Sequence, residues 1–332
     1  MIGTSTLLML LVVAAADPPP LQPAARLLRV EGKVAIFSAD NQSRPATALD
    51  TAYVGERITV STKGQIVLAF RADGHLERVK PGSEVTVGRE GCTPRSAIET
   101  VTAPASYRRT VDSAVRQLRP EGPAAAAIVR APPPPDGTPP ENAPSSSMAR
   151  TPINGSVVLI SRPTFTWPAV DKAAGYEFHL FRDTGKIWSV SVDRPKLEYT
   201  GEQALLPGTD YDWEVFTVSP EHGREKVSGG FFTTATEDQK EHATKLGELA
   251  AGEDIALITL AAAWFDENQM VAEAIAAYER IVRLDPKTAS YWRALGSMYQ
   301  QADREEDANS AFKKADQLRP ARRPSFLPRL PK

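Results

Sequence analysis

A spacing of 34 residues near the C-terminal end constrains this chain more than any other feature. Pro286 and Pro320 stand 34 residues apart, and helix-forming residues dominate from Glu237 onward. This period is typical of arrays in which each unit is a pair of antiparallel helices. We therefore expect a helical region over residues 237–320.

Both units repeat a pattern of large and small apolar residues. Small Gly296 and Ala308 would let two helices approach closely, while large side chains fill the groove between them. The second unit, counted from Ala289, carries Trp292, Leu295, Gly296, Tyr299, Ala308, Phe312, Ala315 and Pro320. A weaker version, counted from Ile255, carries Ile258, Ala261, Ala262, Phe265, Ala274, Tyr278, Ile281 and Pro286. The alternative is a pair of ordinary amphipathic hairpins.

This pattern resembles the tetratricopeptide (TPR) family. In that family partner segments lie against a concave face formed by the first helix of each unit, so the resemblance implies a protein-binding face. The positions that correspond to it here are Thr259, Ala263, Asp266, Arg293, Ser297 and Gln300. For each of them, an ordinary solvated side chain is the alternative. Such arrays usually need about three units. We therefore expect the helix at residues 236–249 to cap the array, or the array to stack on the β-sandwich expected at residues 153–235 or on another protein.

Residues 25–105 have the short apolar runs and turn residues of a β domain. Ile66, Leu68 and Phe70 alternate with Val67 and Ala69, so apolar side chains lie on both faces. That pattern predicts a central strand buried on both sides. The dipeptide Asp73-Gly74 that follows is typical of a hairpin turn.

This β region resembles the FecR-type domain, a small all-β periplasmic module. The resemblance depends on Gly32 with Val34, Val54-Gly55-Glu56 with Ile58, the strand at residues 66–70, Asp73-Gly74, and Pro81 before Val85. It implies a role as a sensor or regulator in transmembrane signalling. That role would require a membrane-spanning segment on the same chain, or action through another protein.

A helix is expected over residues 106–119, because Val111, Val115 and Leu118 fall on one face. Residues 120–152 are rich in proline and alanine, a composition that cannot bury enough apolar area to offset chain entropy. We interpret them as a linker between two β domains.

Seven short β segments separated by turn signals follow over residues 153–235, which predicts a β-sandwich. Two strands should supply the centre of its core, through Tyr176, Phe178 and Leu180 and through Tyr211, Trp213 and Val215. The layout resembles fibronectin type III-like modules in Pro163-x-Phe165-x-Trp167, Ala174-Gly175-Tyr176, Leu206-Pro207-Gly208 and Tyr211-x-Trp213-x-Val215.

The N-terminus reads as an export signal. An apolar run from Leu7 to Ala16 is too short to span a bilayer and ends in a small-x-small pattern before Asp17, so cleavage after residue 16 is expected. Cys92 is the only cysteine. Export without an internal disulfide favours a bacterial periplasmic or secreted location. We expect Cys92 to be a small inert residue near a strand end, with a reactive thiol as the alternative.

The net charge of -2 gives the chain no overall basic field, so nucleic acid is not expected as a partner. The basic tail at residues 321–332 is expected to be a frayed terminus. Four scattered histidines form no metal-binding pair, and no nucleophile elbow or phosphate loop is present. We therefore expect no catalytic residue, no metal and no cofactor.

The combination of domains predicts a non-catalytic multi-domain β-plus-α protein: an exported scaffold or adaptor of the bacterial envelope. The helical face would bind a protein partner, and the β domains would bind wall or membrane components. The FecR-type sensor is one alternative. Carbohydrate binding is another, with an exposed Trp188 stacking on a sugar ring.

Overall fold

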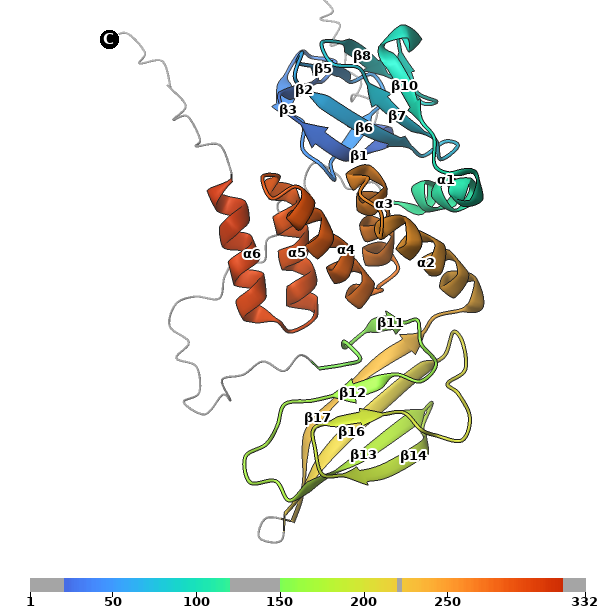
Figure 1. Ribbon diagram of the computed structural model, residues 1–332, viewed down its shortest axis with the longest axis vertical. Helices are drawn as coiled ribbons and strands as arrows, with labels where there is room; N and C mark the ends of the chain where they lie inside the picture. The colour runs from blue at the N-terminus through green and yellow to red at the C-terminus, as the bar shows by residue number, and fades with distance from the viewer. Residues whose placement is uncertain (1–20, 120–149, 220–222, 319–332) are drawn as a thin grey trace, which may run out of the picture.

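The computed structural model describes residues 21–119, 150–219 and 223–318. It contains two β-sandwiches, with a helical array lying between them (Figure 1). The predicted multi-domain β-plus-α fold is confirmed. The expected signal segment (1–16) and tail (321–332), with all but the last three residues of the expected linker (120–152), lie outside the described residues.

The first sandwich consists of two antiparallel five-stranded sheets. Their strand orders are β10-β7-β6-β1-β4 and β3-β2-β5-β8-β9. The strands are β1 (Pro23–Glu31), β2 (Val34–Phe37), β3 (Ser43–Pro45), β4 (Thr51–Tyr53), β5 (Arg57–Val60), β6 (Gln65–Phe70), β7 (Leu76–Val79), β8 (Glu84–Val87), β9 (Cys92–Thr93) and β10 (Ile98–Val101), with a 3-10 turn η1 (Arg95–Ala97) before β10.

Strand β6 is the central strand that the alternating apolar pattern predicted. Ile66, Leu68 and Phe70 point into the sandwich core, whereas Val67 and Ala69 point to the other side and join a core formed with helices. All five side chains are fully buried. The outer face of this sheet is therefore an internal surface of the molecule.

The hairpin predicted at Asp73-Gly74 joins β6 to β7. Gly74 has a φ of +89°, which an L side chain rarely adopts. A Cβ there would also lie 2.4 Å from the backbone of Asp112 in the next helix. Glycine therefore allows both the turn and the close approach of that helix.

That helix, α1 (Arg108–Gln117), follows a short 3-10 turn, η2 (Ala105–Tyr107). Val111, Val115 and Leu118 are all buried, as the helical spacing predicted. They face the helical array and the outer surface of the first sheet.

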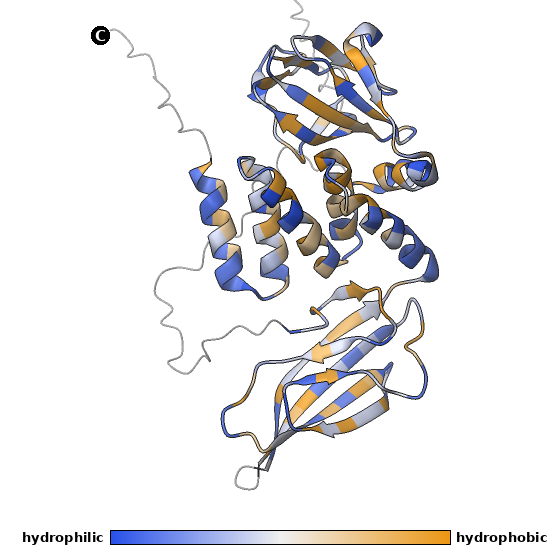
Figure 2. Cartoon of the chain, viewed as in Figure 1, coloured by the Kyte–Doolittle hydropathy of each residue, from blue (hydrophilic) through white to orange (hydrophobic). Residues whose placement is uncertain are grey.

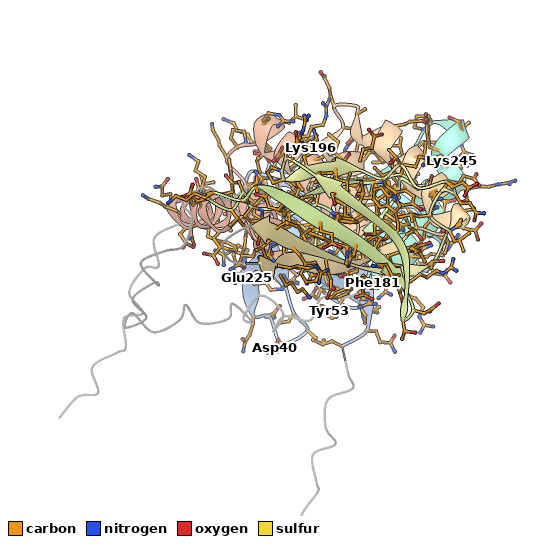
Figure 3. All side chains as sticks on the ribbon, turned by 90° about the horizontal axis from the view of Figure 1, so that it is seen from below. Asp40, Tyr53, Phe181, Lys196, Glu225 and Lys245 are labelled. Carbon is orange, nitrogen blue, oxygen red and sulfur yellow. The ribbon has the colours of Figure 1, made fainter. Side chains whose placement is uncertain are left out.

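The predicted seven-stranded second sandwich is confirmed. Its five-stranded sheet has the order β11-β17-β16-β13-β14, and β12 pairs with β15. Phe181 of the larger sheet and Lys196 of the smaller one lie on opposite sides of the sandwich (Figure 3). The strands are β11 (Ser156–Val158), β12 (Thr164–Thr166), β13 (Gly175–Arg182), β14 (Gly185–Val192), β15 (Lys196–Glu198), β16 (Asp210–Ser219) and β17 (Gly223–Thr234).

The core of this sandwich contains all six residues predicted for its centre, together with Phe165, Trp167 and Phe232. Tyr211 also closes a turn at the start of β16, because its hydroxyl accepts the backbone N–H of Leu206 at 2.9 Å. A tyrosine bonded to backbone a few residues upstream is a recurring device of immunoglobulin-like sandwiches.

Five helices follow: α2 (Glu237–Ala250), α3 (Ile255–Glu267), α4 (Val271–Leu284), α5 (Ala289–Gln301) and α6 (Glu305–Gln317). The 34-residue period is visible in the backbone. Gln269 and Asp303 both have positive φ, at 59° and 56°. Beside them, the Met270 N–H donates to Phe265 O and the Arg304 N–H to Tyr299 O, at 2.8 and 2.9 Å. Helices α3 to α6 are therefore two copies of one helix-turn-helix unit.

One continuous apolar core joins the array to the first sandwich. It includes Leu28, Val67 and Leu76 from the sheet, α1, and residues of α2 to α6. Ile153, Val157 and Leu159 from the start of the second sandwich pack against the same core. Helix α3 is among the most apolar of the helices (Figure 2) and lies at the middle of this core.

Candidate functional site

The first-helix face of the array, predicted to bind a partner, is largely an internal interface. Thr259 is fully buried, and its hydroxyl donates to the carbonyl of Ile255 at 2.7 Å. Ala263 is buried as well. The prediction that Thr259 contacts a partner is wrong for this arrangement, because strand β1 packs across α3 and covers it.

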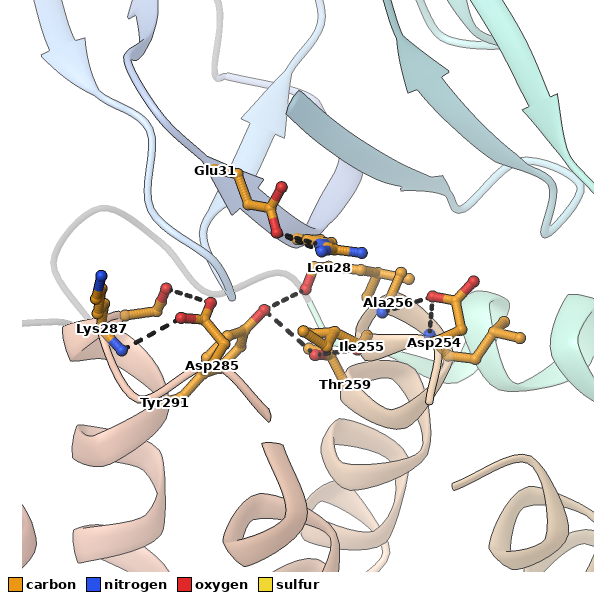
Figure 4. A network of polar contacts seen from close by, with 12 residues as sticks. Leu28, Glu31, Asp254, Ile255, Ala256, Thr259, Asp285, Lys287 and Tyr291 are labelled. Atoms are coloured by element: carbon orange, nitrogen blue, oxygen red, sulfur yellow. Dashed lines mark hydrogen bonds and ion pairs between the residues drawn. The ribbon is translucent and has the colours of Figure 1, made fainter. Parts of the chain in front are cut away.

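Tyr291 makes the polar contact at the centre of this interface. Its hydroxyl donates to the carbonyl of Leu28 on β1 at 2.8 Å and lies 3.4 Å from the hydroxyl of Thr259 (Figure 4). Burial raises the pKa of the Tyr291 hydroxyl well above its ordinary range, so it stays protonated and remains a donor. Helix α5, helix α3 and strand β1 therefore meet at one buried hydroxyl pair.

Neither Leu28 nor Tyr291 was predicted as a contact residue, because neither occupies a position of the repeat pattern. Leu28 lies in the first β domain, outside the repeats, and Tyr291 directly precedes Trp292, the first signature position of the second unit. The only signal was indirect: the doubly apolar strand β6 required some cover for its second face.

Helix α1 is held to α3 by two further polar contacts. The indole N–H of Trp264 donates to the side-chain oxygen of Gln117 at 2.8 Å. At the end of the helix, the Arg119 N–H donates to both carboxylate oxygens of Glu267, at 2.8 and 2.7 Å. Arg26 on β1 donates to the carbonyl of Arg119 at 3.3 Å, so three elements meet here.

Glu267 is the titratable group of this junction. Burial raises the pKa of its carboxyl from 4.5 to about 7, although the Arg119 N–H and the charge of Arg26 act in the opposite direction. Asp266, next along the chain, adds a further upward contribution. The charge of this carboxyl therefore changes near neutral pH.

Three of the predicted residues remain at the surface, together on α5. Gln300 is exposed, while Arg293 and Ser297 are half-buried. Arg293 forms an ion pair with Asp316 of α6 at 3.0 Å, and the Ser297 hydroxyl donates to the Arg293 carbonyl at 3.2 Å. The remaining predicted residue, Asp266, is half-buried on α3. We call Arg293, Ser297 and Gln300 the α5 surface.

Cys92 is fully buried in the core of the first sandwich. Burial raises the pKa of its thiol far above the ordinary value, so a reactive thiolate is disfavoured. Its backbone N–H donates to the buried carboxylate of Glu77 at 2.9 Å. The interpretation of Cys92 as an inert core residue agrees with this environment.

Glu77 is the centre of a buried charge cluster in the first sandwich. Its side chain is fully buried and contacts Arg95 in an ion pair and His75 at 3.1 Å. Burial alone would raise the pKa of Glu77, but the hydrogen bonds from His75 and Cys92, together with the charges of Arg95 and His75, outweigh it and hold the pKa below its ordinary value. Because the Glu77 carboxylate has all of these partners within the sandwich, we interpret the cluster as structural.

Trp188, expected to be an exposed platform for sugars, is half-buried. Its ring makes edge contacts with Phe178 and Tyr199, at centroid distances of 5.6 and 4.9 Å. It packs at the margin of the sandwich core, so the expectation of an exposed ring is wrong.

Among the described residues, no group of three or more His, Cys, Asp or Glu side chains is arranged to hold a metal ion. Likewise, none of the helices in that part of the chain is long and apolar enough to cross a membrane.

No protein-family model matches the chain, and no curated protein matches it. Among solved structures, it is similar to a cell surface anchoring domain, at 22% identity over 20% of this chain and 87% of that one, with a TM-score of 0.19. It is also similar to FN3tt, at 21% identity over 25% and 85%, with a TM-score of 0.21. A third is the FN1-FN3 domains of chicken CNTN1, at 11% identity over 65% and 57%, with a TM-score of 0.21. Likenesses of this size carry no argument about function.

Proposed function

We propose that the chain is a non-catalytic, exported scaffold of the bacterial envelope. Its tetratricopeptide-type repeats fix a FecR-type β domain and a fibronectin type III-like sandwich in one arrangement. The α5 surface then offers a docking position for a protein partner.

The shared apolar core is the observation that carries this proposal. A helical array that only recruited partners would keep its first-helix face open, whereas here α3 uses that face to hold the first sandwich. Beyond this interface the face continues onto α5, where Gln300 is exposed. The first unit and Tyr291 of the second therefore serve internal assembly, and the α5 surface leaves room for a partner.

The end of the array supports the same division. Helix α6 buries Ala308, Ala311 and Ala315 against α5, and its other positions are mostly charged or polar. A polar outer face is how helical arrays end without recruiting another unit. A partner would therefore bind across the α5 surface and not by stacking on α6.

A photo-reactive amino acid placed at Gln300 in the full chain tests the proposal. In cells that produce the protein naturally, we expect illumination to link it to one discrete partner. The same label at Lys313, exposed on α6, is the matched control and should give only background. Equal labelling from both positions, or none from Gln300, would contradict a partner at the α5 surface.

The FecR-type signalling role stays a prediction. Its test is the mature N-terminus of the exported protein, because cleavage after residue 16 would remove the apolar run and leave signalling to another protein.

A further inference from the structure

One edge strand in the described part of the molecule differs from all the others. The edges of the first sandwich, β3, β4, β9 and β10, are two to four residues long, and β3 ends in Pro45. Strand β11 has three residues, and the turn after α3 covers it, where the Val157 N–H donates to Gln269 O at 2.8 Å. Two stretches of open edge are longer. One is the outer side of β17 (residues 223–230), which β11 does not reach and which carries Arg224, Glu225 and Lys226; the other is β14, with eight residues.

The main chain of β14 pairs on one side only. It is last in the order of its sheet, and β13 is its sole neighbour among the described strands. No other hydrogen bond to its backbone is made by the residues that the structure describes. A row of unpaired N–H and C=O groups therefore faces outward, which is a template for another strand.

Both ends of β14 carry the features that natural edges use against unwanted pairing. Lys186 stands near its start, and Ile187 is an extra residue that bulges, because Leu180 pairs with Trp188 and Phe181 with Lys186. Beyond the other end come Asp193, Arg194 and Pro195. Residues 188–192 between them are regular, uncharged and free of proline. The features that oppose pairing therefore flank five residues that lack them, and we call residues 188–192 the gap.

The side chains in this gap alternate by face. Trp188, Val190 and Val192 are half-buried at the margin of the sandwich core, and Ser189 and Ser191 are exposed on the outer face of the sheet. A strand that pairs here must present apolar residues on the core side and small residues on the other. Strand β14 itself has that pattern.

We propose that β14 pairs antiparallel with β14 of a second copy of this chain, so that the two large sheets become continuous. Pairing centred on Val190 uses all five regular residues. It places Trp188 opposite Val192, an aromatic and β-branched pair of the kind that stabilises sheets, and Ser189 opposite Ser191. In the same register Ile187 of each copy lies opposite Asp193 of the other, just outside the five regular residues. This interface involves neither the helical array nor the α5 surface, so it is independent of the proposed scaffold role.

Sedimentation velocity of the full chain over a range of concentrations tests the proposal first. We expect a concentration-dependent dimer, and we expect Ser189→Lys with Ser191→Lys to make the chain monomeric, because lysines then face each other across the pair. The matched control is Thr86→Lys, at an exposed position on β8, which should leave the dimer intact. A wild-type chain that is monomeric throughout would overturn the proposal.

A cross-linking experiment tests the same pairing without depending on whether the lysine variant folds. Val190→Cys places two thiols opposite each other across the two-fold axis, at a Cα separation that permits a disulfide. Mild oxidation should give a linked dimer, whereas Lys196→Cys, on the opposite side of the sandwich, should give none. A dimer that survives the paired lysines and gives no Val190→Cys link would mean that another surface forms it.

Discussion

Tyr291 shows how much of this architecture depends on single polar atoms. Tyr291→Phe removes the hydroxyl that donates to Leu28 O, and leaves that buried carbonyl without its partner. We expect the free energy of unfolding to fall by about 1 to 2 kcal/mol, measured by chemical denaturation. Tyr107→Phe is the matched control: its hydroxyl bonds exposed Glu248, and its loss should change stability by less than about 0.5 kcal/mol. Equal effects would contradict a special role for Tyr291.

Gly74 gives a second test at this scale. Gly74→Ala forces a Cβ against the Asp112 backbone and strains the positive φ, so we expect a loss of about 2 kcal/mol or more. Gly247→Ala, inside α2 with open space around the new methyl group, should instead gain up to about 1 kcal/mol. Thermal unfolding of the two variants checks both signs. A neutral Gly74→Ala would mean that α1 does not lie against the hairpin.

The residue scale is also where prediction from sequence failed. The repeat pattern assigns Thr259 to a face that a partner would cover, and in the structure strand β1 of the same chain covers it. The repeat pattern could not predict that strand β1 would cover this face, because Leu28 lies over 200 residues earlier in the chain. Contacts of this kind follow from how whole domains pack, and no local spacing encodes them.

At the scale of elements, the junction of α1, α3 and β1 should respond to pH. The pKa of Glu267 is about 7 in the folded chain and near 4.5 when unfolded, so its protonated form favours folding. The stabilisation is complete below pH 4.5 and is lost as the pH rises through about 7. Glu267→Gln should remove this dependence, so the stability of the variant relative to wild type should increase from pH 5 to pH 8. Parallel denaturation profiles across that range would contradict the assignment.

Elements themselves were predicted well where one periodicity dominated. Strand β6 was recognised as central because a short run with apolar residues at both parities, bounded by turn residues, is typical of a strand buried on both faces. The seven segments of the second sandwich and the 34-residue helical units were likewise correct. Trp188 was misplaced because alternation along β14 predicts which face a residue occupies, but not how far the neighbouring Tyr199 covers it.

At the scale of the whole molecule, the helical array is covered at both of its ends. Helices α1 and α2 pack on one side of α3, and polar α6 ends the other side. Two units suffice because the first sandwich supplies the apolar surface that a third unit would otherwise provide. The expectation that α2 caps the array agrees with the structure. The expected stacking on the second sandwich involves only residues near its two ends, and the main contact is with the first sandwich instead.

Hydrogen exchange of the full chain carrying Val67→Ala tests the central claim that α3 and the first sheet share one core. Val67 is fully buried on the helix-facing side of β6, and its truncation should cost about 2 kcal/mol. We predict that amides of α3 and of β6 lose the same amount of protection. Val215→Ala, in the core of the second sandwich, is the matched control and should lower the protection of β16 while leaving α3 unchanged. If Val67→Ala weakens β6 and leaves α3 as protected as before, α3 and the first sheet do not share a core.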